Sequence, residues 1–241
     1  MICRHLQPLL VEALGQFPVV AILGSRQVGK STLAQGIVSK AWPARYLTLD
    51  DRAILDAALR DPDGFIRGLD LPVVLDEVQR APALLRAVKL VVDQDRKPGM
   101  FLLTGSANLL TLKSVSESLA GRIALFELHP FSWAELRRRP EPSPMLDALF
   151  EARTTKDVIA VLPKAGEAAT KAELAACILG GGYPIPALMK PGRPRRVWFE
   201  SYRQTYLERY LRDIATVARL PEFGHLLTAA AARTGQLLNV A

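Results

Sequence analysis

Short runs of apolar residues alternate with segments of helical periodicity over the first half of the chain. Fully apolar runs favour strands buried on both faces, because a half-exposed strand alternates apolar with polar residues. Strands are predicted at Val19–Leu23, Ala44–Leu49, Leu71–Leu75, Met100–Leu103 and Ile123–Leu128. Helices are predicted at Leu6–Leu14, Lys30–Lys40, Ile54–Leu59 and Leu84–Val92, with another reaching about Leu119, and a turn is predicted at Asp61–Gly64. Strands separated by helices predict an α/β fold with a parallel sheet flanked by helices.

The pattern changes after Phe131. Arg137–Pro144 is a charged link broken by prolines, and the residues beyond it indicate helix and loop. From Val197 to Val217, apolar and aromatic residues recur at every fourth position, which predicts an amphipathic helix. We therefore expect a sheet domain over residues 1–136 and a smaller helical region over residues 137–241.

Charge is unevenly distributed along the chain. The 241 residues include 31 lysines and arginines against 24 acids, which gives a net charge of +7. Lys190–Arg219 alone carries eight basic and three acidic residues. A basic surface permits contact with nucleic acid or an acidic partner, but it also favours solubility. The aromatic residues of this region are open to two interpretations, core packing and base stacking, of which core packing is favoured: Trp198, Tyr202, Tyr206 and Tyr210.

Several classes of protein are disfavoured by composition. The two cysteines, Cys3 and Cys177, and the three histidines show no metal-binding spacing, so neither a disulfide framework nor a zinc site is expected. The N-terminus lacks the features of a signal peptide, and no apolar run is long enough to cross a bilayer. We expect a soluble cytoplasmic protein that has no membrane partner.

The segment Gly24–Ser31 has the pattern G-x-x-x-x-G-K-S between a predicted strand and a predicted helix. Glycines in such a loop let backbone N–H groups point at phosphate oxygens, and the following helix adds the positive end of its dipole. Lys30 is expected to reach the β- and γ-phosphates of ATP, and Ser31 to bind Mg²⁺. A glycine turn with a chance lysine is disfavoured by the flanking strand and helix. The predicted nucleotide-binding residues are Gly24, Ser25, Arg26, Gln27, Val28, Gly29, Lys30, Ser31, Thr32, Thr104 and Ser106.

An acidic pair follows the apolar run Leu71–Leu75. Asp76 is expected to bind Mg²⁺, and Glu77 to activate the water that attacks the γ-phosphate. Ordinary surface acids are the alternative, but the phosphate-binding pattern earlier in the chain disfavours it. Ligands of parallel α/β sheets bind at the carboxyl ends of the strands, and the polar residues predicted there are Gly24, Asp50, Asp76 and Thr104.

Three other sets of residues have two interpretations each. Thr104 and Ser106 end a strand that should lie close to the Val19–Leu23 strand, where they either sense the γ-phosphate or simply form a turn. Arg26 contacts phosphate or base, or is solvated. Arg122 stabilises transition-state charge in its own chain or in a neighbouring subunit, or pairs with an acid at the surface.

Eight segments carry a further resemblance over nearly the whole chain. They are GSRQVGKSTL, YLTLDD, PVVLDEVQRAPALLRAVKLVVD, FLLTGSANLL, ESLAGR, GGYP, WFESYRQTYLERYLRD and AARTGQLLN. Together they resemble a prokaryotic family of AAA-type ATP-binding proteins with a C-terminal domain of unknown function. The resemblance implies an additional-strand P-loop ATPase domain, then a helical region, a winged-helix-like segment and a further α/β module.

The resemblance also implies roles for individual residues. The family commonly has an acid after TYLER, where this chain has Tyr210, so a polar role at that position is in doubt. The chain stops at Gln236–Ala241, where the family's winged-helix segment begins, and we therefore expect a truncated protein. By this resemblance, Gly24–Thr32 correspond to the family's ATP site, and Asp76 and Glu77 to its metal-binding and catalytic acids. Thr104–Ser106 correspond to its sensor segment, and Arg122 to the arginine of its ESLAGR element.

The leading functional hypothesis is an ATP-binding protein that hydrolyses ATP with Mg²⁺ and uses the cycle as a conformational switch. The first alternative is a DNA-associated regulator or motor in which ATP controls binding, which the basic C-terminal third supports weakly. The second is a phosphotransferase, which Glu77 and the lack of a visible acceptor site disfavour. A homo-oligomer, a weak DNA contact and an unidentified protein partner are compatible with the sequence.

Overall fold

A computed structural model describes residues 2–106, 119–139, 145–161, 169–207, 220–234 and 236. The chain divides into two compact units, Met1–Leu188 and Met189–Ala241. The first unit contains a five-stranded sheet in the order β2-β3-β4-β1-β5, and every neighbouring pair is parallel. Its strands are β1 (Val19–Leu23), β2 (Arg45–Thr48), β3 (Val73–Asp76), β4 (Phe101–Thr104) and β5 (Ile123–Glu127). The predicted parallel sheet is confirmed, and so is the position of β4 beside β1.

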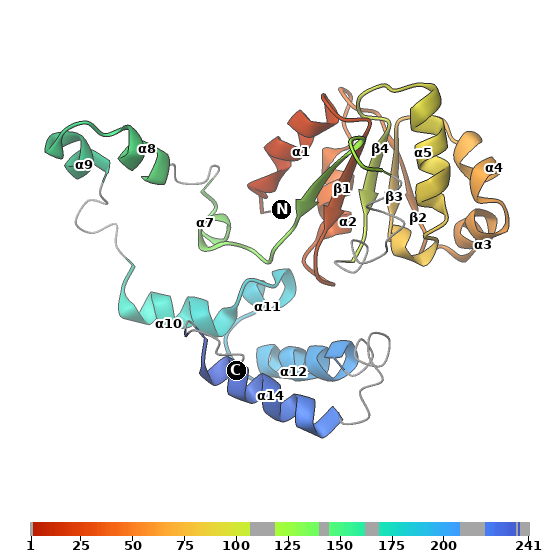
Figure 1. The fold of residues 1–241 in the computed structure, drawn as a ribbon. Coiled ribbons are helices and arrows are strands. Elements are labelled where there is room, and N and C mark those ends of the chain that lie inside the picture. Colours follow the sequence, from red (N-terminus) through yellow and green to blue (C-terminus); the bar gives the residue numbers. More distant parts are fainter. Residues whose placement is uncertain are drawn as a thin grey trace, which may run out of the picture. The chain divides into compact units, whose positions relative to one another are not determined.

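Helices cover both faces of this sheet (Figure 1). Side chains alternate along each strand, so neighbouring residues enter different cores. The helices of this domain are α1 (Leu6–Leu14), α2 (Lys30–Ile37), α3 (Arg52–Arg60), α4 (Pro62–Arg67) and α5 (Leu84–Gln94), with a 3₁₀ turn η1 at Val78–Arg80. Val20 and Ile22 pack with α1 and α2, whereas Val19 and Ala21 pack with α3, α4 and α5. Burial on both faces explains the continuous apolar runs of β1, β3 and β4.

The predicted turn at Asp61–Gly64 is wrong, because the helix α4 begins there. The Asp61 carboxylate accepts a hydrogen bond from the Gly64 N–H over 2.9 Å and so caps the first turn. Pro62 occupies the first helical position, where its missing N–H costs nothing. Residues that favour a turn therefore start a helix at this point.

Helices also make up the described remainder of the chain. The first unit adds α7 (Trp133–Leu136), α8 (Met145–Glu151), α9 (Thr155–Val161), α10 (Lys171–Gly180) and α11 (Pro184–Leu188). The second unit contains α12 (Arg193–Tyr202), a π-helical turn η3 (Arg203–Leu207) and α14 (Leu220–Ala232). None of the helices in the described ranges is long and apolar enough to cross a membrane.

Two predicted helices include residues that the structure does not describe, and one of them has different bounds from those predicted. The helix expected at Val197–Val217 begins earlier, at Arg193, and its α-helical geometry ends at Tyr202. The Trp198 ring stacks on Tyr202 with centroids 5.0 Å apart, but no residue of α12 is fully buried. The remaining residues of that prediction, 208–219, and the helix expected before Leu119 lie outside the described ranges.

Candidate functional site

The loop between β1 and α2 has a backbone that requires glycine. Gly24 has φ of +146°, and a Cβ added there would lie 2.4 Å from the carbonyl oxygen of Leu128. Gly29 has φ of +97° and caps the start of α2. Such positive φ values favour glycine, because side chains clash with their own backbone there. The loop Gly24–Gly29 thus turns tightly at the carboxyl end of β1 and leads directly into a helix N-terminus.

Lys30 folds back across this loop. Its ammonium group donates hydrogen bonds to the carbonyl oxygens of Gly24 and Ser25, each over 3.0 Å. The side chain is only 5% exposed. Burial lowers the pKa of Lys30, while the nearby charges of Glu77 and Asp76 act in the opposite direction. A buried positive charge therefore lies at the loop, within the influence of both predicted acids.

The predicted metal-binding residues contact each other directly. The Ser31 hydroxyl donates to Oδ1 of Asp76 over 2.9 Å, which brings the first turn of α2 against the end of β3. Asp76 is 3% exposed, so its carboxylate oxygens need hydrogen-bond donors from the protein. Thr104, at the end of β4, also donates to Oδ1.

Two donors to Asp76 were not predicted. The Tyr46 hydroxyl donates to Oδ2 over 2.7 Å, and the Thr48 hydroxyl donates to the same oxygen over 3.3 Å. Burial raises the pKa of Tyr46 to about 12, and the hydrogen bond to Asp76 adds to this shift. The two residues are spaced i and i+2 on β2, so they share a face, and Thr48 pairs with Asp76 in register. The spacing of the two hydroxyl groups can be seen in the sequence, but the pairing of β2 with β3 is needed to place them beside Asp76.

Glu77 is linked to β4 through its backbone and its side chain. Its N–H donates to the Thr104 hydroxyl over 3.1 Å. Its carboxylate accepts a hydrogen bond from the side-chain amide of Gln79, and the Ser106 N–H donates to the carbonyl oxygen of that amide over 3.2 Å. Thr104 and Ser106 are both buried. The structure thus brings the predicted acids and the end of β4 together, and Gln79 is an unpredicted member of the group.

Arg26 and Asp50 lie in the same region. Arg26 is exposed, and its positive charge helps to lower the pKa of Lys30. Asp50 follows β2 and forms an ion pair with Arg80 of η1.

Arg122 lies at the opposite edge of the sheet. It directly precedes β5, and its carbonyl oxygen accepts a hydrogen bond from the Val19 N–H at the start of β1, over 3.3 Å. A strand of five residues separates it from the phosphate-loop end, roughly 16 Å at about 3.3 Å per residue. Its guanidinium pairs with Asp93 over 2.5 Å. The structure therefore does not bring Arg122 to the loop of its own chain, and shows it paired with an acid.

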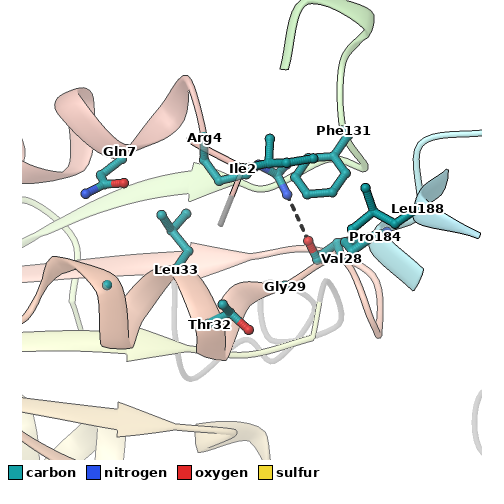
Figure 2. A pocket seen from close by; sticks show the side chains of 11 residues that line it. Ile2, Arg4, Gln7, Val28, Gly29, Thr32, Leu33, Phe131, Pro184 and Leu188 are labelled. Atoms are coloured by element: carbon teal, nitrogen blue, oxygen red, sulfur yellow. Dashed lines mark hydrogen bonds between the residues drawn. The ribbon is translucent and has the colours of Figure 1, made fainter. Parts of the chain in front are cut away.

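An apolar pocket lies beside the loop, on the side of α1 (Figure 2). Val28, Leu33, Phe131 and Pro184 contribute to its lining. Arg4 is buried at its edge, where it donates to the Val28 carbonyl oxygen over 3.0 Å and to Glu135 over 3.1 Å, and lies over the Phe131 ring. Burial lowers the pKa of Arg4, and the ion pair with Glu135 opposes the shift. Because Arg4 binds the loop and α7 together, it fixes one wall of the pocket.

The GGYP segment is part of the same surface. The Gly182 carbonyl oxygen accepts a hydrogen bond from the Phe131 N–H over 2.7 Å, and a Cβ at Gly182 would lie 2.4 Å from the Phe131 oxygen. The next residue, Tyr183, shares a hydrogen bond with the Ser25 hydroxyl over 3.3 Å. A segment more than 150 positions away in the sequence therefore contacts the loop.

Comparison with protein families gives two matches. Residues 16–137 match the family described as the AAA domain. Residues 171–241 match a domain of unknown function, DUF8612. The first match includes the loop, both acids and the end of β4, so it covers the site described above.

Similar proteins were also found. The chain is 32% identical over 213 residues to the uncharacterized proteins Rv2008c of Mycobacterium tuberculosis and Mb2031c of Mycobacterium bovis. The match covers 88% of this chain, which spans about 40% of the length of these relatives. Among solved structures, the Walker-type ATPase PABY2304 of Pyrococcus abyssi is similar at 18% identity and a TM-score of 0.44, over 96% of this chain and 76% of the other.

Proposed function

The chain belongs to the AAA-domain family, and from this premise we propose that it binds ATP and hydrolyses it with Mg²⁺. The observation that carries the proposal is the hydrogen bond of 2.9 Å between the Ser31 hydroxyl and the Asp76 carboxylate. It joins a glycine-dependent loop at a helix N-terminus to an acid at the end of β3, a parallel strand that β4 separates from β1 in the sheet. At the loop, backbone N–H groups and the helix dipole favour a phosphate group. At the end of β3, the Asp76 carboxylate favours a cation.

The residues present fit a magnesium ion. Ser31 and Asp76 offer hard oxygen ligands, the type that Mg²⁺ prefers. Within the described ranges no group of three or more His, Cys, Asp or Glu residues is placed to hold a metal. A site of one carboxylate and one hydroxyl suits an ion that also uses phosphate oxygens and water. Bound Mg²⁺ would neutralise the charge that develops on the β- and γ-phosphates.

Lys30 is proposed to bind the phosphates of the nucleotide, and the apolar pocket to bind its base. Lys30 would exchange the Gly24 and Ser25 carbonyl oxygens for phosphate oxygens, a stronger interaction because both partners are charged. The pocket beside Val28 offers apolar walls for a planar base at the same loop. Its wall includes Phe131 and Pro184, which suit stacking against a base (Figure 2).

In the proposed reaction, Glu77 is the general base. It accepts a proton from a water molecule as the water oxygen bonds to the γ-phosphorus. The bond between that phosphorus and the bridging oxygen breaks, its electron pair stays on ADP, and inorganic phosphate is released. The hydrogen bond between Tyr183 and Ser25 supports a switch role, because it connects the loop to the segment that precedes α11.

Substitution of Glu77 tests this function. Glu77→Gln should leave ATP affinity nearly unchanged, while phosphate release falls roughly 10²- to 10⁴-fold, the range for a lost general base. Glu12→Gln, at an exposed position of α1, is the matched control and should hydrolyse ATP at the wild-type rate. Phosphate release by Glu77→Gln at the wild-type rate would reject Glu77 as the base, and a wild-type chain without phosphate release would reject the ATPase.

A further inference from the structure

We infer that Gln79 is a positioning residue that holds the Glu77 carboxylate and ties it to the end of β4; the inference rests on the proposed ATPase function. The side-chain amide of Gln79 uses both of its ends. Nε2 donates to Oε2 of Glu77, and Oε1 accepts from the Ser106 N–H over 3.2 Å. No other described side chain joins these two groups.

The amide orientation follows from its two partners. A carboxylate oxygen only accepts hydrogen bonds, and a backbone N–H only donates them. A flipped amide would set its oxygen against the Glu77 carboxylate and its NH₂ group against the Ser106 N–H, which loses both bonds. Gln79 therefore has a single favourable orientation, and its ends cannot exchange roles.

The backbone places Gln79 over Glu77. Glu77 has φ of +61°, in the left-handed region, so the chain turns sharply after Asp76 into η1. Within this turn the Arg80 N–H donates to the Glu77 carbonyl oxygen over 3.0 Å. Such a conformation is disfavoured for a glutamate, so its surroundings must hold it there. Thr104 holds the Glu77 backbone, and Gln79 holds its side chain.

These hydrogen bonds connect the acid to the phosphate loop. β4 pairs with β1 so that Thr104 is opposite Ile22, and the Gly105 N–H donates to the Ile22 carbonyl oxygen over 3.1 Å. The phosphate loop begins two residues after Ile22. Through Gln79, the carboxylate is therefore fixed relative to the strand that carries the loop. Its other oxygen, Oε1, makes no hydrogen bond within the described ranges and can accept the proton of a water molecule.

Substitution of Gln79 tests this role by separating turnover from affinity. Gln79→Met keeps the length of the side chain and removes both hydrogen bonds. We expect kcat to fall on the order of tenfold, the loss for one hydrogen bond to a charged group. KM and the Kd for ATP should stay at wild-type values, because Gln79 contacts the general base Glu77 and not the phosphate-binding loop. Gln79→Glu keeps an acceptor for Ser106 but sets a second carboxylate against Glu77, so its kcat should fall at least as far.

A double variant distinguishes positioning from a general structural effect. If Gln79 acts only through Glu77, Glu77→Gln combined with Gln79→Met should be no slower than Glu77→Gln alone. Gln16→Met is the matched control, because Gln16 also donates to a glutamate, Glu12, over 3.4 Å, but at an exposed position just after α1. It should keep the wild-type kcat.

The outcomes separate this inference from the function on which it rests. Three outcomes would overturn this inference but not the proposed function. They are a wild-type kcat in Gln79→Met, a loss of ATP affinity in Gln79→Met as large as its loss of kcat, and additive losses of kcat in the double variant. A wild-type chain without phosphate release would overturn the proposed function and this inference with it. Full turnover in Glu77→Gln would reject Glu77 as the base, and with it this inference, but not ATP hydrolysis by the chain.

Discussion

The Tyr46 hydroxyl donates a hydrogen bond to Oδ2 of Asp76 over 2.7 Å, from the edge strand β2 to the carboxyl end of β3. Ser31 binds the other carboxylate oxygen, so Asp76 is held from two sides. Groups that orient a metal ligand in this way contribute to metal affinity as well as to structure.

Tyr46→Phe removes this donor and keeps the ring. We expect the Mg²⁺ concentration for half-maximal ATP hydrolysis to rise, by up to about tenfold, the lower end of the range for a lost orienting group. ATP affinity measured without Mg²⁺ should change little, since the hydrogen bond that is lost is to Asp76 and not to the loop Gly24–Gly29. Calorimetry with and without Mg²⁺ provides the comparison, and an unchanged requirement for Mg²⁺ would show that Tyr46 serves folding alone.

Lys30→Ala should weaken ATP binding at least about tenfold, because the variant cannot make the charge-assisted hydrogen bonds to the phosphates. Lys40→Ala, at an exposed position beyond α2, is the control for a general loss of positive charge. Titration of a fluorescent ATP analogue measures both. Equal affinity in the wild type and Lys30→Ala would reject the assignment of the loop.

Two glycines of the same segment should respond oppositely to alanine. At Gly24 the added Cβ meets the Leu128 oxygen at 2.4 Å, so Gly24→Ala should lower the free energy of unfolding by more than about 1 kcal/mol and abolish ATP binding. At Gly36, inside α2, the added Cβ meets nothing within 4 Å. Gly36→Ala should therefore raise the free energy of unfolding by roughly 0.5–1 kcal/mol. Denaturant unfolding measures both, and a stable Gly24→Ala that binds ATP would contradict the tight turn.

Arg122→Ala should leave ATP hydrolysis unchanged in dilute solution, because Arg122 lies at the sheet edge away from the loop. Its ion pair with Asp93 is partly exposed, and removing it should cost no more than about 1 kcal/mol of stability. Phosphate release should be measured over a wide range of protein concentration. Loss of activity by Arg122→Ala in dilute solution would contradict the expectation. If the activity per chain of the wild type rises with concentration and that of Arg122→Ala does not, the arginine acts on a neighbouring subunit.

DNA binding by this chain is expected to be weak and sensitive to salt. Arg196 and Arg203 of the second unit are exposed, whereas Arg195 donates a hydrogen bond to the Met189 carbonyl oxygen. Arg196→Ala with Arg203→Ala should lower the slope of log K against log salt by roughly 0.9 for each phosphate that the protein no longer neutralises. Arg52→Ala, an exposed arginine of α3, is the control. Sequence-specific binding that persists at physiological salt would contradict this expectation.

Local chemistry explains what the sequence determined by itself. Consecutive apolar residues gave β1 with its observed bounds, and helical spacing gave α1 in the same way. Gly24 and Gly29 mark the loop because their backbone conformations favour glycine whatever surrounds them. The parallel sheet also followed, since strands that alternate with helices pair in this way. Each of these signals depends on residues within a few positions of one another.

Tertiary structure decided which distant residues meet. The hydroxyl groups of Tyr46 and Thr48 are visible in the sequence, but only the pairing of β2 with β3 brings them to Asp76. Likewise, only the pairing of β5 with β1 sets the Arg122 carbonyl oxygen against the Val19 N–H. Strand order joins segments far apart in the chain through backbone hydrogen bonds that any residue can make. Local side-chain patterns therefore predict each strand of the sheet, but not the complete order of the strands.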